Sequence, residues 1–337
     1  MLDYYGLMSR PNRLIPLTLA AACICGAAFG APPPAAEGPN NSSLDGELFY
    51  QLLVSEMSVR SGEPGAAYAL MLNAARKANS PLLYERAVEI ALRARSGEAA
   101  LDAARAWAQA FPSSMQANRF QLQILLGMNK IAETQEPVKR ELARLAPAER
   151  AAAMGLLPRY FSRAADKKLA ASVIEKALAS ELANRATGPS AWAAIGALRL
   201  QADDAPGALD AAQRGAALDA GAEEPLLLAS ALIGPKAPAA EAMVRTYLAR
   251  KPTADVRMAY ARSLVNLQRF AEAYAQAQAL TKEKPDFADA WLMRGSLELQ
   301  DVNLTTAESS LKTYVALNPP SEENAHGSSM EIGRAHV

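Results

Sequence analysis

The sequence predicts an all-α fold in which helix pairs stack into a solenoid, and three observations lead to this prediction. Pro252, Pro285 and Pro319 follow one another at intervals of 33 and 34 residues, and Trp192 and Trp291 lie 99 residues apart, which is three such intervals. No segment alternates apolar and polar residues over a length that would indicate a β-strand. Half of the residues are hydrophobic, which is too many for a disordered chain. A period of this length indicates a repeat array, in which each unit buries its apolar face against its neighbours.

The composition excludes several classes of function. The chain has 35 Lys and Arg against 35 Asp and Glu, whereas a nucleic-acid-binding protein needs an excess of positive charge. Its two histidines, His326 and His336, both lie near the C-terminal end, so the rest of the chain has no histidine for acid–base catalysis or metal binding. No phosphate-binding glycine loop and no nucleophile elbow occur. We therefore expect a protein that is not an enzyme, with no cofactor, metal, small-molecule substrate or nucleic-acid partner.

The first 30 residues are organised like a secretory signal peptide. Two arginines precede an apolar run at 14–30, and the small residues Ala28 and Gly30 stand where a signal peptidase would cleave. The apolar run contains a proline and is short for a transmembrane helix. We expect residues 1–30 to direct export, with Met8 as an alternative start.

The two cysteines lie inside this predicted leader, so cleavage would leave a mature chain without thiols. Cys23 ends the segment LAAAC, which resembles a bacterial lipoprotein box with its leucine one place too early. Lipidation at Cys23 is therefore the alternative to cleavage. Residues 31–45 are rich in Pro, Ser and Asn and are expected to form a flexible linker. Together these features predict a periplasmic protein, or alternatively an outer-membrane lipoprotein that faces the periplasm.

The units in the first half of the expected array, which spans residues 46–320, are degenerate. Tyr84, Ala100 and Pro112 are in register, and Ala66 precedes Ala100 by 34 residues. The helix pairs expected in this half cover residues 46–79, 80–112, 114–147 and 148–187.

The second half carries a clearer pattern, in which an aromatic residue is followed by Gly four places later, Ala sixteen places later and Pro about twenty-eight places later. The unit at 254–287 departs from it, with Arg257 in the place of the aromatic residue. The residues that define the pattern across these units are Trp192, Gly196, Ala208, Ala261, Ala273, Pro285, Trp291, Gly295, Ala307 and Pro319.

This pattern resembles the tetratricopeptide repeat, a unit of two antiparallel helices. The resemblance implies a right-handed superhelix of about eight helix pairs. Small residues at fixed positions let the two helices approach closely, the aromatic residue fills the gap to the neighbouring helix, and proline ends the second helix.

The resemblance also implies a binding groove lined by the first helix of each unit. Its apolar and polar side chains suit an extended or helical peptide, with burial at the apolar positions and register set by the polar ones. Val265 and Leu299 share this register but are expected to be core residues. The predicted groove residues are Asp255, Met258, Arg262, Asn266, Asp289, Leu292, Ser296 and Gln300.

The functional expectation is a non-catalytic scaffold that binds a peptide or protein in the bacterial cell envelope. One alternative is the periplasmic part of an outer-membrane export or assembly component whose C-terminal domain is missing. Another is an enzyme whose catalytic domain would lie beyond residue 320. Both alternatives concern sequence that the chain does not include.

The C-terminal residues 321–337 are expected to be a disordered tail. The last seven, EIGRAHV at 331–337, match the translation of common sequencing-adapter DNA. This match predicts a truncated reading frame with an artificial end, and a natural disordered tail is the alternative.

Overall fold

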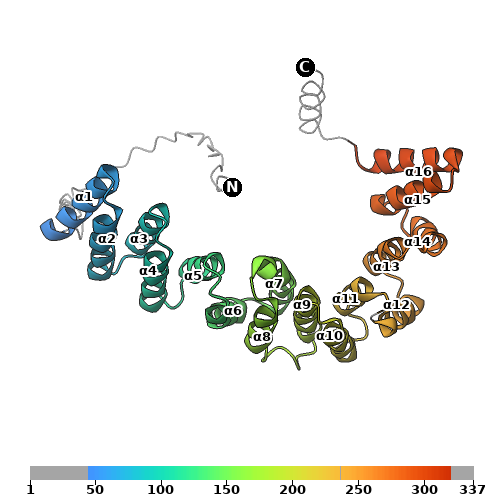
Figure 1. The fold of residues 1–337 in the computed structure, drawn as a ribbon, viewed down its shortest axis with the longest axis horizontal. Helices are drawn as coiled ribbons and strands as arrows, with labels where there is room; N and C mark the ends of the chain where they lie inside the picture. Colours follow the sequence, from blue (N-terminus) through green and yellow to red (C-terminus); the bar gives the residue numbers. More distant parts are fainter. Residues whose placement is uncertain (1–44, 236, 320–337) are drawn as a thin grey trace, which may run out of the picture. The chain divides into compact units, whose positions relative to one another are not determined.

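The computed structural model describes residues 45–235 and 237–319, and every described helix belongs to a compact unit that begins at Gly46. These residues form sixteen α-helices and two short 3-10 helices, with no β-strand among them (Figure 1). The predicted all-α helix-pair array is thereby confirmed. The predicted leader, Cys23, nearly all of the linker and the predicted tail lie outside the described residues.

The helices follow one another as eight pairs, and helices that are adjacent in the chain pack against each other along most of the array. The first four pairs are α1 (Gly46–Ser61) with α2 (Pro64–Ala78), α3 (Pro81–Arg93) with α4 (Gly97–Ala110), α5 (Met115–Gly127) with η1 (Ile131–Thr134) and α6 (Gln135–Ala143), and α7 (Pro147–Tyr160) and η2 (Phe161–Arg163) with α8 (Lys167–Ala177). The last four are α9 (Gly188–Gln201) with α10 (Ala205–Leu218), α11 (Glu224–Leu232) with α12 (Pro238–Arg250), α13 (Ala254–Asn266) with α14 (Phe270–Glu283), and α15 (Ala288–Gln300) with α16 (Leu304–Leu317).

The turns within the pairs explain where the helices stop. Five of them place a residue other than glycine in the left-handed region, which reverses the chain within three residues. Asn and Asp adopt this conformation more readily than other residues, as Asn129 and Asp203 do, whereas Val302, with φ of 59°, is β-branched and strained. Prolines then begin many of the following helices, because the first helical N–H needs no partner within the helix.

Small residues bring helices together where the sequence pattern places them. Ala208 of α10 and Ala273 of α14 have no exposed surface. At Gly196 of α9, an added Cβ would lie 2.2 Å from Cδ2 of Leu228 and 3.1 Å from Cβ of Ala211. Glycine therefore permits an approach of α9 to both α10 and α11 that no side chain would allow.

The other pattern residues take varied positions. Trp192, Ala261 and Ala307 are buried, and an added Cβ at Gly295 would lie 2.8 Å from Cγ of Leu311. Trp291 is only half-buried, and its indole N–H donates to the carbonyl oxygen of Pro285 at 2.8 Å. Pro285 and Pro319 are exposed beyond the ends of α14 and α16. The aromatic position thus packs deeply at Trp192 and only partly at Trp291.

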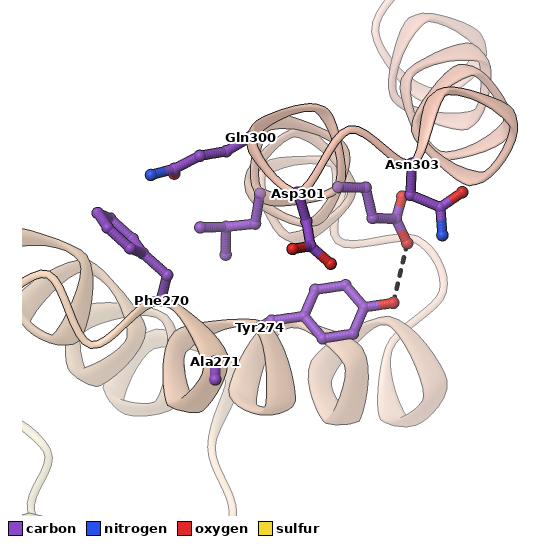
Figure 2. A pocket seen from close by; sticks show the side chains of 8 residues that line it. Phe270, Ala271, Tyr274, Gln300, Asp301 and Asn303 are labelled. Atoms are coloured by element: carbon purple, nitrogen blue, oxygen red, sulfur yellow. Dashed lines mark hydrogen bonds between the residues drawn. The ribbon is translucent and has the colours of Figure 1, made fainter.

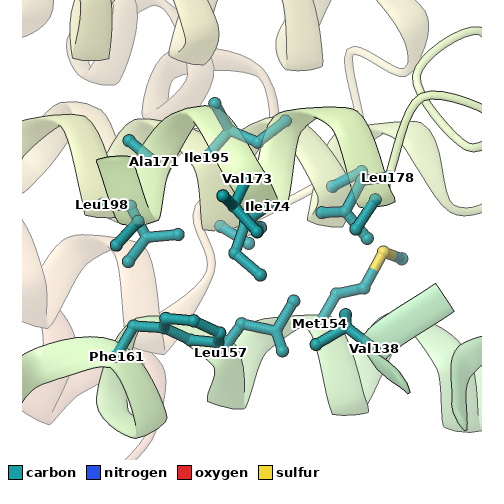
Figure 3. Packing of buried hydrophobic residues seen from close by; sticks show 14 of the residues in the cluster. Val138, Met154, Leu157, Phe161, Ala171, Val173, Ile174, Leu178, Ile195 and Leu198 are labelled. Atoms are coloured by element: carbon teal, nitrogen blue, oxygen red, sulfur yellow. The ribbon is translucent and has the colours of Figure 1, made fainter. Parts of the chain in front are cut away.

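The core is a succession of clusters along the array. One cluster spans α2 to α5, a second spans η1 to α10, and a third runs from α10 to α15. In the second cluster, Met154, Leu157 and Phe161 face Ile174 and Leu178 of the α8 segment (Figure 3). Helix α7 makes its most extensive contacts with α9, and residues 178–187 form turns that connect α8 to α9. The repeat geometry is therefore least regular in this middle region.

Candidate functional site: surfaces formed by the first helices

An ion pair joins the first helices of the last two units. Nη2 of Arg262 on α13 donates to Oδ2 of Asp289 on α15 at 2.8 Å, and more than half of each side chain is exposed. Two of the predicted groove residues, from different units, therefore lie side by side on one accessible surface. An exposed pair of this kind contributes less than about 1 kcal/mol to stability, so both groups remain available to a ligand.

The other predicted groove residues on α13 and α15 divide into accessible and buried positions. Met258 is buried with Leu280 of α14 and Ala290 of α15, so its prediction as a groove residue is wrong. Its position on α13 turns toward the second helix of the pair, where it serves the core. Leu299 was expected in the core but is 46% exposed, whereas Val265 is half-buried against the third cluster. The accessible predicted residues are Asp255, Asn266, Leu292, Ser296 and Gln300.

A groove with a measurable volume lies elsewhere, between α5 and α7. It has a volume of about 490 Å³, and most of its lining is apolar. We call it the α5–α7 groove. Its lining residues are Arg119, Leu122, Gln123, Leu126, Val138, Glu141, Leu142, Leu145, Ala153, Leu156, Leu157 and Tyr160.

The α5–α7 groove exists because the first helices separate there. Helix α7 packs mainly against α9, and α5 packs mainly against α4, η1 and α6. Val138 and Leu142 of α6 are buried, whereas Leu156 and Tyr160 of α7 are 47% and 55% exposed. Two large side chains on α7 are thus left open to solvent beside buried side chains of α6.

Polar groups stand at one edge of this groove. Nε of Arg119 donates to Oε1 of Glu141 at 2.9 Å, and Nδ2 of Asn118 donates to Oε2 of the same carboxylate at 3.1 Å. The Asn118 amide also donates to the carbonyl oxygen of Pro137, which connects α5 to α6. These bonds hold the position of α6 relative to α5.

The α5–α7 groove was not predicted from the sequence, although one signal pointed to it. At 100° per residue, the apolar residues Met154, Leu156, Leu157 and Tyr160 of the helix at 147–160 cover about 160° of its circumference, which is wider than one core-facing stripe of about 100°. The units that match the repeat pattern best, α13 with α14 and α15 with α16, predict a groove on α13 and α15 instead.

A second hollow lies between α14 and the turn that joins α15 to α16 (Figure 2). It has a volume of about 500 Å³, and Phe270, Tyr274, Gln300 and Asp301 are among the residues that line it. Glu298, in its wall, is 3% exposed and accepts hydrogen bonds from Oη of Tyr274 at 3.0 Å, Nε of Arg294 at 2.9 Å and Oγ of Ser310 at 2.7 Å.

The environment of Glu298 favours its charged form. Burial raises the pKa of this carboxyl, but the hydrogen bonds from Ser310, Arg294 and Tyr274 outweigh burial and leave the pKa below its ordinary value. A carboxylate held ionised by three donors is a poor general acid. Its bonds instead tie together α14, α15 and α16.

A similar cluster joins α12, α13 and α14. Nη1 and Nη2 of Arg269 donate to the two carboxylate oxygens of Glu241 at 2.7 and 2.8 Å, and Oη of Tyr260 donates to Oε1 at 2.8 Å. The Arg269 bonds lower the pKa of Glu241 to about 2, assisted by Tyr260. Burial and the bond to Glu241 raise the pKa of Tyr260 to about 12. This cluster also connects helices of neighbouring units.

The described residues offer no metal centre, since no group of three or more His, Cys, Asp or Glu among them could hold an ion. None of the helices in residues 45–235 and 237–319 is long and apolar enough to cross a membrane.

Comparison with solved structures returns helical proteins of low sequence identity. A tetratricopeptide repeat protein from Parabacteroides merdae is 12% identical, with 82% of this chain and 95% of that chain covered and a TM-score of 0.38. Yeast Tom70 is 9% identical over 80% of this chain and 68% of that chain, with a TM-score of 0.36. PilW, described as a widely conserved type IV pilus biogenesis factor, is 16% identical over 63% of this chain and 97% of that chain, with a TM-score of 0.30.

No family model and no curated protein sequence matches the chain. Its resemblance to tetratricopeptide repeats is carried by the helix pairs and the close contacts at Gly196 and Gly295 described above.

Proposed function

We propose that this protein is a non-catalytic scaffold that binds a segment of another protein on the surface formed by its first helices. The observation that carries the proposal is the α5–α7 groove, an accessible apolar hollow of about 490 Å³ with polar groups at its edge. Its volume lies within the range of about 300–1,000 Å³ that is usual for ligand pockets.

The groove suits an amphipathic helical segment. Leu126, Leu145 and Leu156 offer apolar walls for two or three anchor side chains, because helix-in-groove recognition buries residues spaced by three and four along the ligand. Arg119 and Glu141 lie at the rim, where a polar residue of the ligand would set its register. Apolar anchors would supply most of the affinity.

The exposed residues of α13 and α15 extend the proposed binding surface. Arg262, Asn266 and Gln300 present charge and amide groups, and Leu299 adds an apolar contact. In this proposal a long partner segment contacts both the α5–α7 groove and this polar region. Stacked repeats present extended surfaces of this kind.

A cross-linking experiment tests the α5–α7 groove. A photoreactive amino acid at Gln123, which is exposed in the groove lining, is expected to form defined adducts in cells. Leu156→Asp should abolish these adducts because it places a charge in the apolar wall. Leu82→Asp is the matched control, since Leu82 is 75% exposed on α3 and away from the groove. Adducts that survive Leu156→Asp would refute the proposal.

A second pair of substitutions tests the polar region independently. Arg262→Glu combined with Asn266→Ala should weaken capture of the same partner through cross-linkers placed on α15. If every adduct remained at its wild-type level, α13 would have no part in binding.

We place this function in the bacterial envelope, because residues 1–30 have the organisation of an export signal. The alternative role is a periplasmic portion of an outer-membrane export or assembly component. Mass spectrometry of the protein recovered from the periplasm should give a mature chain that begins at Ala31. Retention of residues 1–30 would contradict export by cleavage, and a lipid attached to Cys23 would identify the alternative localisation as an outer-membrane lipoprotein.

A further inference from the structure

The positive charge of this chain is concentrated around the α5–α7 groove. Residues 111–170, which contain α5, α6, α7 and η2, have ten Lys and Arg against five Asp and Glu. The whole chain has 35 residues of each sign, so the rest of the chain carries a net charge of −5. The groove therefore lies in a basic region of a chain that is acidic elsewhere.

Two arginines continue the exposed face of α7 that borders the groove. Leu156 and Tyr160 line the groove, and Arg163 follows them by seven and three residues in η2, which directly continues α7. Arg159 lies three residues after Leu156. Residues at these spacings lie on one face of a helix. Both arginines are exposed, and neither forms an ion pair among residues 45–235 and 237–319.

A lysine adds its charge at the same place. Nζ of Lys167 donates to the backbone carbonyl oxygen of Ser162, which places the ammonium group beside η2. The acidic neighbour, Asp166, accepts a backbone N–H of α8 at 2.9 Å and forms no ion pair within the described part of the chain. We call Arg159, Arg163 and Lys167 the basic cluster. Its like charges repel one another, so a carboxylate placed among them would be favourable.

The basic cluster stands where both helices that line the groove end. Oδ1 of Asn129, two residues after α5, accepts from the backbone N–H of Ala165, two residues after η2, at 3.0 Å. The C-terminal ends of α5 and of the α7 segment therefore lie beside each other. Arg119 lies about 12 Å from this end along α5, because eight residues separate it from Gly127, the last residue of the helix.

The charges at the opposite end of the groove do not repeat this excess. Arg119 pairs there with Glu141 at 2.9 Å. Glu149, in the first turn of α7, accepts from the backbone N–H of Ala146 at 3.3 Å. The groove is thus apolar along its length and positively charged at one end only, which matches a helix that is apolar along one side and acidic at one end.

We propose that the α5–α7 groove binds an amphipathic helical segment that is acidic at one end, with its apolar side chains in the groove and its carboxylates against the basic cluster. This inference rests on the proposed function and names the class of partner. The apolar lining favours a protein segment over phosphate-bearing ligands, because phosphate groups would leave Leu126 and Leu156 uncovered. The complementary charge selects acidic segments against basic ones.

Fluorescence anisotropy with the full chain and synthetic helical peptides tests the proposal. The peptides have blocked termini, leucines at positions i, i+3 and i+4, and a pair of residues at each end that is Glu, Gln or Lys. A pair at each end places carboxylates near the basic cluster whichever way the peptide binds. At about 50 mM salt the Glu peptide should bind at least about tenfold more tightly than the Gln peptide, and the Lys peptide should bind most weakly. High salt should reduce these differences, because it screens exposed charges.

Three variants locate the binding. Arg159→Glu with Arg163→Glu should lower the affinity for the Glu peptide at least about tenfold and raise the affinity for the Lys peptide. Lys282→Glu with Lys284→Glu makes the same charge change at exposed residues near the end of α14, and it should leave both affinities unchanged. Leu156→Gln should weaken all three peptides, because it removes an apolar contact without a change of charge. Unchanged circular dichroism checks that the variants fold.

The outcomes separate this inference from the proposed function. Equal affinities for the three peptides, all weakened by Leu156→Gln, would refute the acidic partner and leave the proposed function standing. If the Glu peptide failed to bind the wild type at about 100 μM, or if its binding survived Leu156→Gln, the inference would be overturned, and cross-linking at Gln123 would decide the proposed function separately. Binding to phosphatidylglycerol vesicles in place of the peptides would assign the basic cluster to a membrane surface and would also overturn the inference.

Discussion

Replacing Gly196 with alanine tests whether close approach of helices holds the array together. Gly196 lies in the interior of α9, where an added Cβ would stand 2.2 Å from Cδ2 of Leu228 and 3.2 Å from the carbonyl oxygen of Ala208. Leu228 is only 7% exposed, so its side chain has little room to move away. Either α11 or α10 must shift to admit the methyl group.

Two opposing effects set the change in the free energy of unfolding that Gly196→Ala should cause. Overpacking a well-filled core costs about 1–3 kcal/mol. Alanine also stabilises a helix interior by about 1 kcal/mol relative to glycine. The net effect of Gly196→Ala is therefore a destabilisation of up to about 2 kcal/mol.

A matched substitution removes the helix-propensity effect. Gly155 lies inside α7, and an added Cβ there would meet nothing within 4 Å. Gly155→Ala should therefore stabilise the protein by about 0.5–1 kcal/mol. The difference between the two variants measures the steric contact alone, and we expect it to be about 1–3 kcal/mol.

Urea unfolding of both variants and the wild type provides the measurement. Tryptophan fluorescence reports on the region concerned, because Trp192 lies one turn before Gly196 on α9. If the two variants differed by less than about 0.5 kcal/mol, the close contact between α9 and α11 would not contribute to stability, and the reasoning from small residues to packing would be wrong.

Four further substitutions separate structural from surface roles. Glu298→Gln should lower the free energy of unfolding by about 2 kcal/mol, because it leaves buried donors without their charged partner. Arg262→Ala removes only an exposed ion pair and should lower it by less than about 1 kcal/mol. Urea unfolding of the two variants distinguishes these outcomes. Val302→Asn should raise the melting temperature through a gain of about 1 kcal/mol, because asparagine tolerates the positive φ and the valine is already 77% exposed. The pKa of Glu241, about 2 in the fold against an ordinary 4.5, predicts stability that is present above pH 4.5 and lost as the pH falls toward 2. Glu241→Gln should flatten this part of a melting curve recorded against pH, and an unchanged acid slope would contradict the assignment.

Much of the fold could be predicted from the sequence because its signals are local or periodic. The spacing of the prolines and tryptophans gave the length of one unit. The predicted succession of helices, the small residues at Gly196 and Gly295 and the absence of strands among residues 45–235 and 237–319 agree with the structure. Local chain stiffness and helix periodicity decide these features, and neither requires knowledge of distant contacts. The fourth pair differs, because α7 packs against α9 rather than against α8.

The candidate site was predicted less well because accessibility depends on how each helix is rotated about its axis. Met258 and Leu292 occupy equivalent positions in two neighbouring units, yet Met258 is buried and Leu292 is 39% exposed. A rotation of a fraction of a turn is enough to exchange core and surface along one edge of a helix. Arg262 and Asp289 form an ion pair because α13 lies beside α15 in the tertiary structure, and the sequence alone does not show this pairing.

The sequence by itself determined that this chain forms helix pairs, how long each pair is and which small residues lie between them, because a repeated pattern encodes contacts between neighbours. Only the tertiary structure decided where accessible hollows open. The α5–α7 groove depends on α7 packing against α9 rather than against α5. Such a separation arises from the summed volumes of many side chains, and no single position in the sequence records it.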